Sequence, residues 1–389
     1  MISLETRYFN TNRILLLILG LWPYKQSLFT RLQLILLFNT LTTYVLFQFT
    51  IFLTSKCTLD LILKVFSSGF FFVCIMIKYN SFCVNINTIK SMCEQLQNLY
   101  NELKDVNEVA ILEKYGSRSK RFTTAIMVFA VTGEIIFALL QIWLHIHNSV
   151  LSANKSHPPE IVITEYFIDQ EKYFYLITMH RYAAWIIGGF AMVGTGTWLI
   201  AYLQHICGMF NIACYRIEQA MTADIIQMRC LKSEKEIHKE IICAIDIHRK
   251  AMKYTNFFII NFERSFFFLI ASGMVSLCLN LVCIAMFDGH IEQLVLPIVM
   301  SIVLYFYLFI ANYVAQEITE HNSYVFVTTY DNQWYMAPLN IQKMVLFLLQ
   351  RGTKSFNVIL GGIFVASMES AASLLSASIS YCTVLYSTR

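Results

Sequence analysis

Seven long apolar stretches run along this chain of 389 residues, and more polar segments separate them. A helix needs about 20 apolar residues to cross a hydrocarbon layer about 30 Å thick. The stretches of this kind lie near residues 32–55, 61–79, 122–147, 172–203, 257–287, 293–316 and 355–386. The pattern predicts an all-α membrane protein, a single domain over residues 1–389 with seven transmembrane helices.

Two further patterns concern the segments outside these stretches. The short run Ile14–Leu21 has the length of a signal peptide core, but Trp22 and Pro23 follow it in place of a cleavage site. We therefore expect an uncleaved interfacial or re-entrant segment. Segments 85–115 and 214–254 carry apolar residues at spacings of three and four amid charges. They predict helical extensions that pack together outside the membrane; the alternative is solvated amphipathic loops.

The composition is that of a membrane protein, and the positions of its basic residues predict its orientation in the membrane. Only 14% of the residues are charged, against about a quarter in soluble domains. Of the 29 Lys and Arg residues, 22 fall in the segments up to Arg31 and at 78–121, 204–256 and 317–354. Because short basic loops stay in the cytoplasm, we expect an intracellular N-terminus and an extracellular C-terminus. This is the reverse of a G-protein-coupled receptor.

No enzyme class finds support in the sequence. It contains no phosphate-binding loop, nucleophile elbow or zinc-enzyme motif. His238 and His248 lie among glutamates in a charged segment, where a solvated helix face is favoured over a metal site. The net charge of +4 comes from the basic loops rather than from a nucleic-acid patch. We expect no catalytic residue, cofactor or metal.

Two charged residues fall deep inside predicted spans. Glu134 lies midway along the third stretch and Arg181 about nine residues into the fourth, which runs in the opposite direction. Because a charge in the bilayer is costly, we predict that they form an ion pair; the alternative is that each faces a watery cavity. Asn154, in the loop 148–170, begins an Asn-Lys-Ser acceptor on the expected outer side and is a candidate glycosylation site.

The last stretch differs from the others in its small polar residues. Eight serines and threonines recur between Ser355 and Thr383, with Glu369 as the only charge. Small residues on membrane helices usually permit close packing, and they can also line a wet pore. On residue types alone, packing is the favoured interpretation.

The C-terminal third carries motifs of a known family. Segments 317–320, 330–335 and 350–354, together with the ending Ser380–Leu385, resemble insect odorant receptors, and the likeness extends over nearly the whole chain. Segments 169–175 and 204–210 are similar to the lineage of ants, bees and wasps. Gustatory receptors end on a different signature, and the co-receptor has a longer loop than the one at 204–256. The chain therefore resembles a ligand-tuned subunit.

This resemblance implies a heteromeric, ligand-gated, non-selective cation channel in the plasma membrane of olfactory sensory neuron dendrites. Four subunits, including the co-receptor, would surround one pore. The last helix would be split into a cytoplasmic and a pore-lining part, with cytoplasmic anchor segments near 204–256 and 317–354. A pore-lining last helix replaces the packing interpretation given above. Motif position suggests pore or gate residues at Tyr381, Val384, Leu385 and Thr388, where Thr388 departs from the apolar residue of the co-receptor.

The resemblance also implies that a small hydrophobic volatile or cuticular ligand binds in the outer half of four spans. Taking residues at that depth gives the candidates Val65, Phe66, Gly69, Gly133, Ile136, Phe137, Leu140, Tyr175, Thr178, Met179, Tyr182, Met300, Val303 and Tyr307. Such an apolar and aromatic wall suits a small hydrophobic molecule. The alternative function is a non-channel membrane transporter, and a purely structural scaffold comes third.

Overall fold

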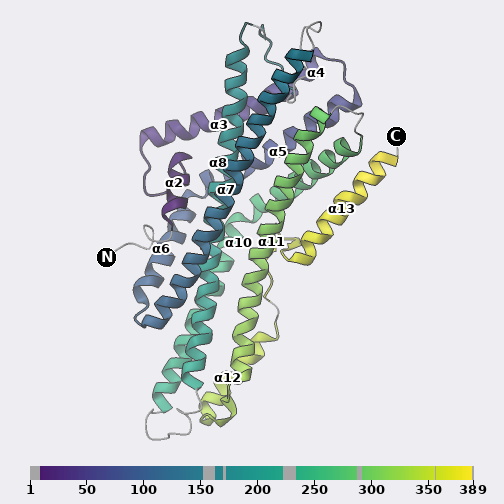
Figure 1. Cartoon of the computed structure of the whole chain (residues 1–389). Coiled ribbons are helices and arrows are strands. Elements are labelled where there is room, and N and C mark those ends of the chain that lie inside the picture. Colours follow the sequence, from purple (N-terminus) through teal and green to yellow (C-terminus); the bar gives the residue numbers. More distant parts are fainter. Residues whose placement is uncertain are drawn as a thin grey trace.

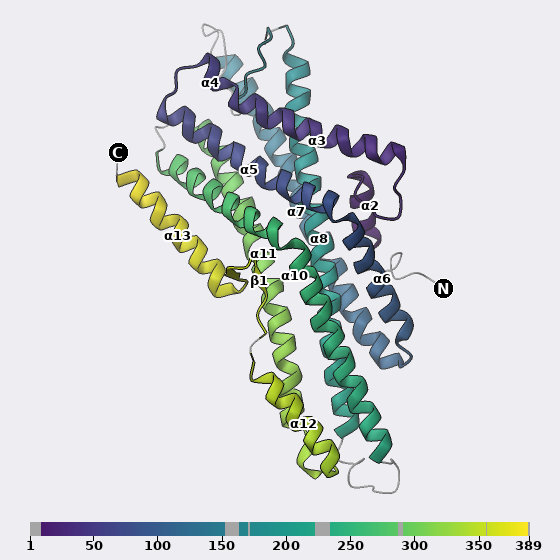
Figure 2. The same cartoon turned by 180° about the vertical axis from the view of Figure 1, so that it is seen from behind.

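The computed structural model describes residues 9–151, 163–169, 172–221, 234–286, 291–354 and 356–387. The candidate residues Asn154 and Thr388 lie outside these ranges. The chain forms an elongated bundle of long helices (Figures 1 and 2). Their bounds are α2 Asn10–Ile18, α3 Leu28–Phe49, α4 Ile51–Thr54, α5 Leu59–Val84, α6 Ile86–Glu102, α7 Val106–Leu151, α8 Phe174–Met221, α10 Glu234–Ala285, α11 Ile291–Asp331, the 3₁₀ turn η1 Trp334–Met336, α12 Leu339–Gly352 and α13 Met368–Ser387.

Six helices in the described part of the chain are long and apolar enough to cross a membrane: α3 with α4, α5, α7, α8, α10 and α11. They coincide with the first six apolar stretches. α13 is a seventh helix of 20 residues, whose recurring serines lower its hydropathy. The architecture is therefore the all-α, seven-helix membrane fold expected from the sequence.

The last stretch is only partly helical, contrary to the expected span from 355 to 386. Residues Ile359–Leu360 (β1) and Phe364–Val365 (β2) pair as an antiparallel hairpin. The turn between them uses Gly361 and Gly362 at φ +61° and +72°, a conformation that costs other residues energy. The hairpin separates α12 from α13, so the expected division of the last helix is present.

α13 begins where polar groups of α11 hold its first turn. The Ser367 hydroxyl accepts a hydrogen bond from the Ser370 amide at 3.1 Å, which caps the helix. The side-chain oxygens of Asn312 and Gln316 accept from the amides of Ser367 and Met368 at 3.0 and 2.8 Å. These contacts fix the N-terminus of α13 to α11.

The polar segments form a packed bundle beyond the apolar spans, at the end that carries α12 (Figure 1). On α6, Ile89 and Met92 are 0% exposed, and Ile217 on α8 and Ile241 and Ala244 on α10 are at most 1% exposed. Segments 85–115 and 214–254 are thus buried helical extensions rather than solvated loops, wherever they are described.

Most of the run at Ile14–Leu21 belongs to a short helix that buries one face, while Ile14 and Ile18 are exposed. α2 has nine residues, too few to cross a bilayer, and Leu16, Leu19 and Leu21 are at most 1% exposed. The Tyr79 hydroxyl on α5 donates to the Leu19 carbonyl at 2.9 Å. A re-entrant segment held by α5 and α8 fits these contacts.

His248 is buried in the extension of α10, which contradicts the expected solvated face. It is 3% exposed, its Nε2 lies 2.9 Å from the Asn322 Oδ1, and its ring meets Phe326 edge-on. Burial lowers the pKa of His248, and the nearby Arg351 contributes in the same direction. No cluster of metal-ligating side chains is found in the described segments.

The burial of His248 predicts that acid lowers the stability of the folded protein. Because the folded state keeps His248 neutral while the unfolded state binds a proton near pH 6.5, stability is lost as the pH falls below that value. The thermal midpoint of the detergent-purified protein should therefore fall on acidification from pH 7.5 to 5.5, and His248→Asn should reduce this fall. His238→Gln, which changes an exposed histidine, is the matched control. An unchanged pH dependence in His248→Asn would contradict the assignment.

Candidate ligand-binding cavity

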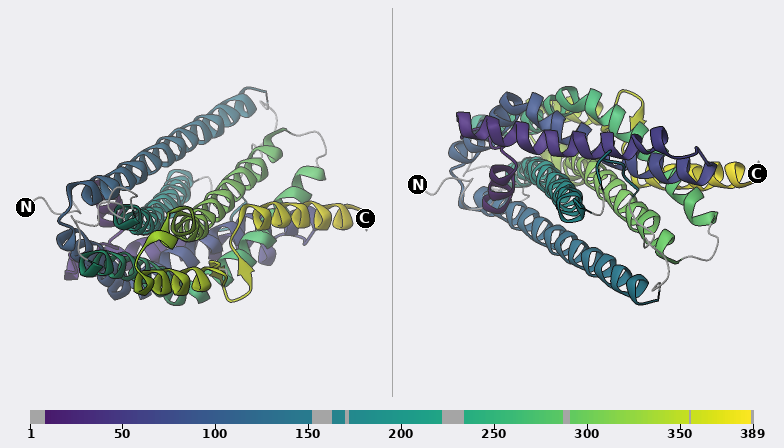
Figure 3. Two further views of the ribbon diagram at one scale, coloured as in Figure 1. Left: turned by 90° about the horizontal axis from the view of Figure 1, so that it is seen from below. Right: turned by 90° about the horizontal axis from the view of Figure 1, so that it is seen from above.

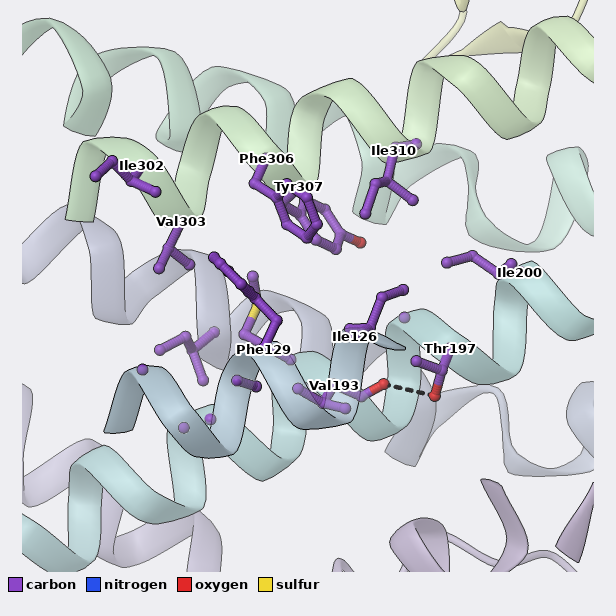
Figure 4. Close-up of a pocket in the computed structure, with 18 of the residues that line it drawn as sticks. Ile126, Phe129, Val193, Thr197, Ile200, Ile302, Val303, Phe306, Tyr307 and Ile310 are labelled. Carbon is purple, nitrogen blue, oxygen red and sulfur yellow. Dashed lines mark hydrogen bonds between the residues drawn. The ribbon is translucent and has the colours of Figure 1, made fainter. Parts of the chain in front are cut away.

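A cavity of about 360 Å³ lies among the membrane-spanning helices. Five helices and the β1–β2 hairpin contribute to its wall. Figure 4 shows the side chains of α11 facing those of α7 and α8 across it. The labelled lining residues are Ile126, Phe129, Val193, Thr197, Ile200, Ile302, Val303, Phe306, Tyr307 and Ile310.

Aromatic rings close one end of the cavity. Trp185 on α8 stacks with Phe71 of α5 at 6.0 Å between ring centroids and contacts Phe137 of α7 at 5.0 Å. The indole Nε1 donates to the Tyr44 hydroxyl at 3.0 Å, which fixes the ring orientation. Such oriented rings form a preformed apolar wall.

The other end of the cavity reaches the hairpin that leads to α13. Val358 and Leu360 line it together with Phe258 of α10. β1 also packs against α10, and α13 packs against α10 and α11. The β1–β2 hairpin, α10 and α11 thus lie between a molecule in the cavity and α13.

Few polar groups face the cavity. The Thr197 hydroxyl donates to the Val193 carbonyl of its own helix at 2.8 Å, so it is already satisfied. The other side chains with polar groups in the lining are those of Trp185, Tyr307 and Glu134. The arrangement suits an apolar ligand with one or two hydrogen-bonding groups.

Lys78 lies behind this wall although the sequence places it at the edge of the second span. It is 4% exposed, its Nζ donates to the Met192 carbonyl at 3.2 Å and it sits 3.7 Å from the centroid of the Tyr307 ring. Gly196 makes room for this ammonium, because a Cβ there would lie 3.1 Å from Nζ. The cation–π contact compensates part of the cost of burial.

The structure divides the sequence-derived ligand candidates. Those that line the cavity are Gly133, Ile136, Phe137, Leu140, Val303 and Tyr307. Those that do not are Val65, Phe66, Gly69, Tyr175, Thr178, Met179, Tyr182 and Met300.

The candidates outside the cavity have other environments. The Phe66 ring packs against the Phe49 ring, with 5.5 Å between the ring centroids, and Gly69 also contacts Phe49. This side of α5 therefore packs against α3. Tyr175 and Met179 are 86% and 66% exposed at the outer end of α8. Val65 and Met300 are buried in helix packing, and Thr178 and Tyr182 are half-buried.

The cavity lies deeper along α8 than the sequence suggests. The lining on this helix begins at Trp185 and continues to Leu203, whereas the candidates ended at Tyr182. Gly188, Gly189 and Gly196 line this stretch. These glycines, which leave space beside a helix, are the signal in the sequence that could have located the site.

The structure does not form the predicted ion pair between Glu134 and Arg181. The Glu134 Oε1 lies 2.8 Å from the position of a Cβ on Gly189. Gly189 is eight residues beyond Arg181, about 12 Å along the helix. A count of residues from the span ends does not give the register of α7 against α8, and the predicted pair missed this offset. Arg181 instead interacts electrostatically with Tyr44 and Tyr182.

The suggested pore residues lie on α13, which stands at the side of the bundle (Figure 3). Tyr381 and Val384 are 62% and 57% exposed. The backbone of Leu385 continues the same helix. Exposed apolar and aromatic side chains on a helix at the periphery are available for contact with other subunits or with lipid.

Comparisons with known proteins agree with this architecture. The sequence matches the family described as 7tm Odorant receptor over residues 58–379. The fold is similar to the insect olfactory receptor OR5 of Machilis hrabei in complex with eugenol, with a TM-score of 0.79 and 15% identity over 99% of this chain and 98% of the other. A second structure of that receptor gives a TM-score of 0.77 at the same identity and coverage. The family match covers most of the chain, which therefore belongs to the 7tm odorant receptor family, a family of multi-pass membrane receptors.

Proposed function

We propose that this odorant receptor is the ligand-tuned subunit of a cation channel formed with the family's co-receptor in the dendrites of olfactory sensory neurons. One observation carries the proposal: an apolar cavity lies inside the helix bundle and reaches the hairpin that precedes α13. The similar receptor from Machilis hrabei was determined in complex with eugenol, a small molecule. This supports a small, largely apolar odorant as the occupant of the cavity.

The mechanism follows from the path between cavity and α13. A ligand shifts a conformational equilibrium only by its different affinity for the two states. Val358 and Leu360 contact the cavity while Ser367 and Met368 are tied to α11. A ligand that favours one position of α11 or the hairpin therefore favours one position of α13. In the proposed tetramer α13 lines the pore together with the last helices of the other subunits, with Val384 in an apolar constriction.

The direct test is an odour panel applied to cells that express this chain with the co-receptor. We expect odour-evoked cation current that needs both subunits. Cells that express the co-receptor alone are the control. Odour-evoked solute flux by this chain without a partner subunit would favour a transporter, and a current that requires a G protein would contradict the channel.

The hairpin turn provides a prediction about coupling. A Cβ on Gly361 would lie 2.9 Å from the Phe267 Cα of α10, and the positive φ disfavours a side chain there as well. Gly361→Val should therefore displace the hairpin and reduce the maximal current at saturating ligand by about tenfold or more. Gly273→Ala is the control, since its Cβ would meet only the Cys74 Sγ at 4.0 Å. Equal currents in the two variants would contradict the role of the hairpin.

A further inference from the structure

Glu134 brings a carboxyl group into a cavity that is otherwise almost wholly apolar. It lies on α7, and its Oε1 fills the space that Gly189 of α8 leaves open. Any side chain at position 189 would occupy the place of the carboxylate, because a Cβ would come within 2.8 Å of it. Gly189 therefore leaves the room in which the Glu134 carboxyl group lies at the cavity wall.

This carboxyl group has no hydrogen-bond or ion-pair partner among the residues that the structure describes. The neighbouring polar groups are engaged elsewhere: Trp185 donates to Tyr44, and Thr197 donates to Val193. An ionisable residue within a membrane span is costly and usually marks a functional site. The missing partner is thus expected to come from the molecule that occupies the cavity.

The geometry points to Glu134 as the group that determines ligand specificity: we propose that it accepts a hydrogen bond from the odorant, which is a small, largely apolar molecule with an O–H or N–H donor. This inference rests on the cavity being the odorant site. The ligand class follows, since an alcohol can donate a hydrogen bond to a carboxyl oxygen of Glu134, whereas an ether or an alkane of the same size has no donor to offer it.

The expected discrimination follows from hydrogen-bond energetics. Hydrogen bonds to charged or strongly polar oxygens are among the stronger ones in proteins. A site with a buried acceptor rejects an analogue that lacks the donor, because binding then desolvates the acceptor without compensation. We expect wild-type receptor to prefer an alcohol over its isomeric ether by about tenfold in Kd.

The test measures binding to the purified receptor in lipid nanodiscs. The probes are the straight-chain alcohols from 1-hexanol to 1-decanol, each paired with the methyl ether of the same formula. Binding is followed by tryptophan fluorescence, since Trp185 lines the cavity. If no alcohol binds, or if alcohols and ethers bind equally well, the proposal is overturned.

Three substitutions assign the preference to one residue. Glu134→Leu should abolish it by weakening alcohol binding while ether binding is kept or improved, and Glu134→Gln should retain several-fold preference because the amide oxygen still accepts. Thr132→Val, which removes an exposed hydroxyl on α7 that does not line the cavity and is already bonded to the Val128 carbonyl of its own helix, should leave the preference unchanged. Equal weakening of alcohol and ether in Glu134→Leu would show a merely structural role.

Tyr307 is the competing candidate, because its hydroxyl also faces the cavity (Figure 4). Tyr307→Phe should keep the alcohol preference if Glu134 is the acceptor; loss of the preference in Tyr307→Phe but not in Glu134→Leu would overturn the proposal. Binding is measured without any channel current. Selective alcohol binding by a protein that gives no current would therefore refute the proposed function and leave this inference intact.

Discussion

Replacement of Val303 by tryptophan should abolish the odour response while the receptor still reaches the cell surface. Val303 lies on α11 and points into the cavity, opposite α7 and α8 (Figure 4). An indole at this position would occupy the space of the ligand. Where it meets side chains that are already packed, forcing in the extra atoms would also destabilise the receptor by about 1–3 kcal/mol. We expect the concentration for half-maximal current to rise by at least about 100-fold.

The control for this variant is Phe309→Trp. Phe309 lies on the same helix, is 39% exposed and does not line the cavity. This variant should respond like the wild type. An unchanged response in Val303→Trp, with equal surface labelling of the two variants, would mean that odorants bind elsewhere.

Loss of Glu317 should give the largest destabilisation of the helix bundle. Its side chain is 8% exposed and pairs with Arg118 of α7. It also accepts hydrogen bonds from Gln204 of α8 and from the Tyr313 hydroxyl. Removing one partner of a fully buried pair costs about 3–5 kcal/mol, and because 33% of the Arg118 side chain is exposed, we expect the low end of this range. Glu317→Ala should lower the thermal midpoint of the purified receptor by roughly 5 °C or more.

Two further variants test the cause of this loss. Glu320→Ala removes an exposed carboxylate that accepts a hydrogen bond from Gln316 of the same helix, and should leave the midpoint nearly unchanged. The double variant Arg118→Met with Glu317→Met removes both charges and should be more stable than Glu317→Ala. If the double variant is the less stable one, the uncompensated charge is not the cause.

The sequence predicts the number and type of the membrane helices well, because hydropathy follows directly from residue type. It fails at the last span, where residues 355–367 are apolar enough to continue a helix. There Gly361 and Gly362 adopt positive φ values beside α10, and a hairpin forms. That choice depends on tertiary contact, which local hydropathy does not encode.

The ligand cavity illustrates a second limit. The resemblance implies the participating helices, and cavity residues indeed come from α5, α7, α8 and α11. Depth along α8 could not be inferred, because its 48 residues contain a long apolar run with no marker of the membrane boundary. Glu134 shows the consequence. Its depth in the predicted span suggested a pair with Arg181, whereas the register of α7 against α8 places it beside Gly189.

Ligand binding inside the bilayer should open a cation path formed by the receptor subunits themselves. This is measured in excised membrane patches that contain this chain and the co-receptor and are bathed in solution without nucleotides. An activating odorant should evoke cation current in such patches, and patches carrying Val303→Trp should give no current. Odour responses that vanish on excision and return only with GTP would show instead that a separate, G-protein-dependent channel carries the current.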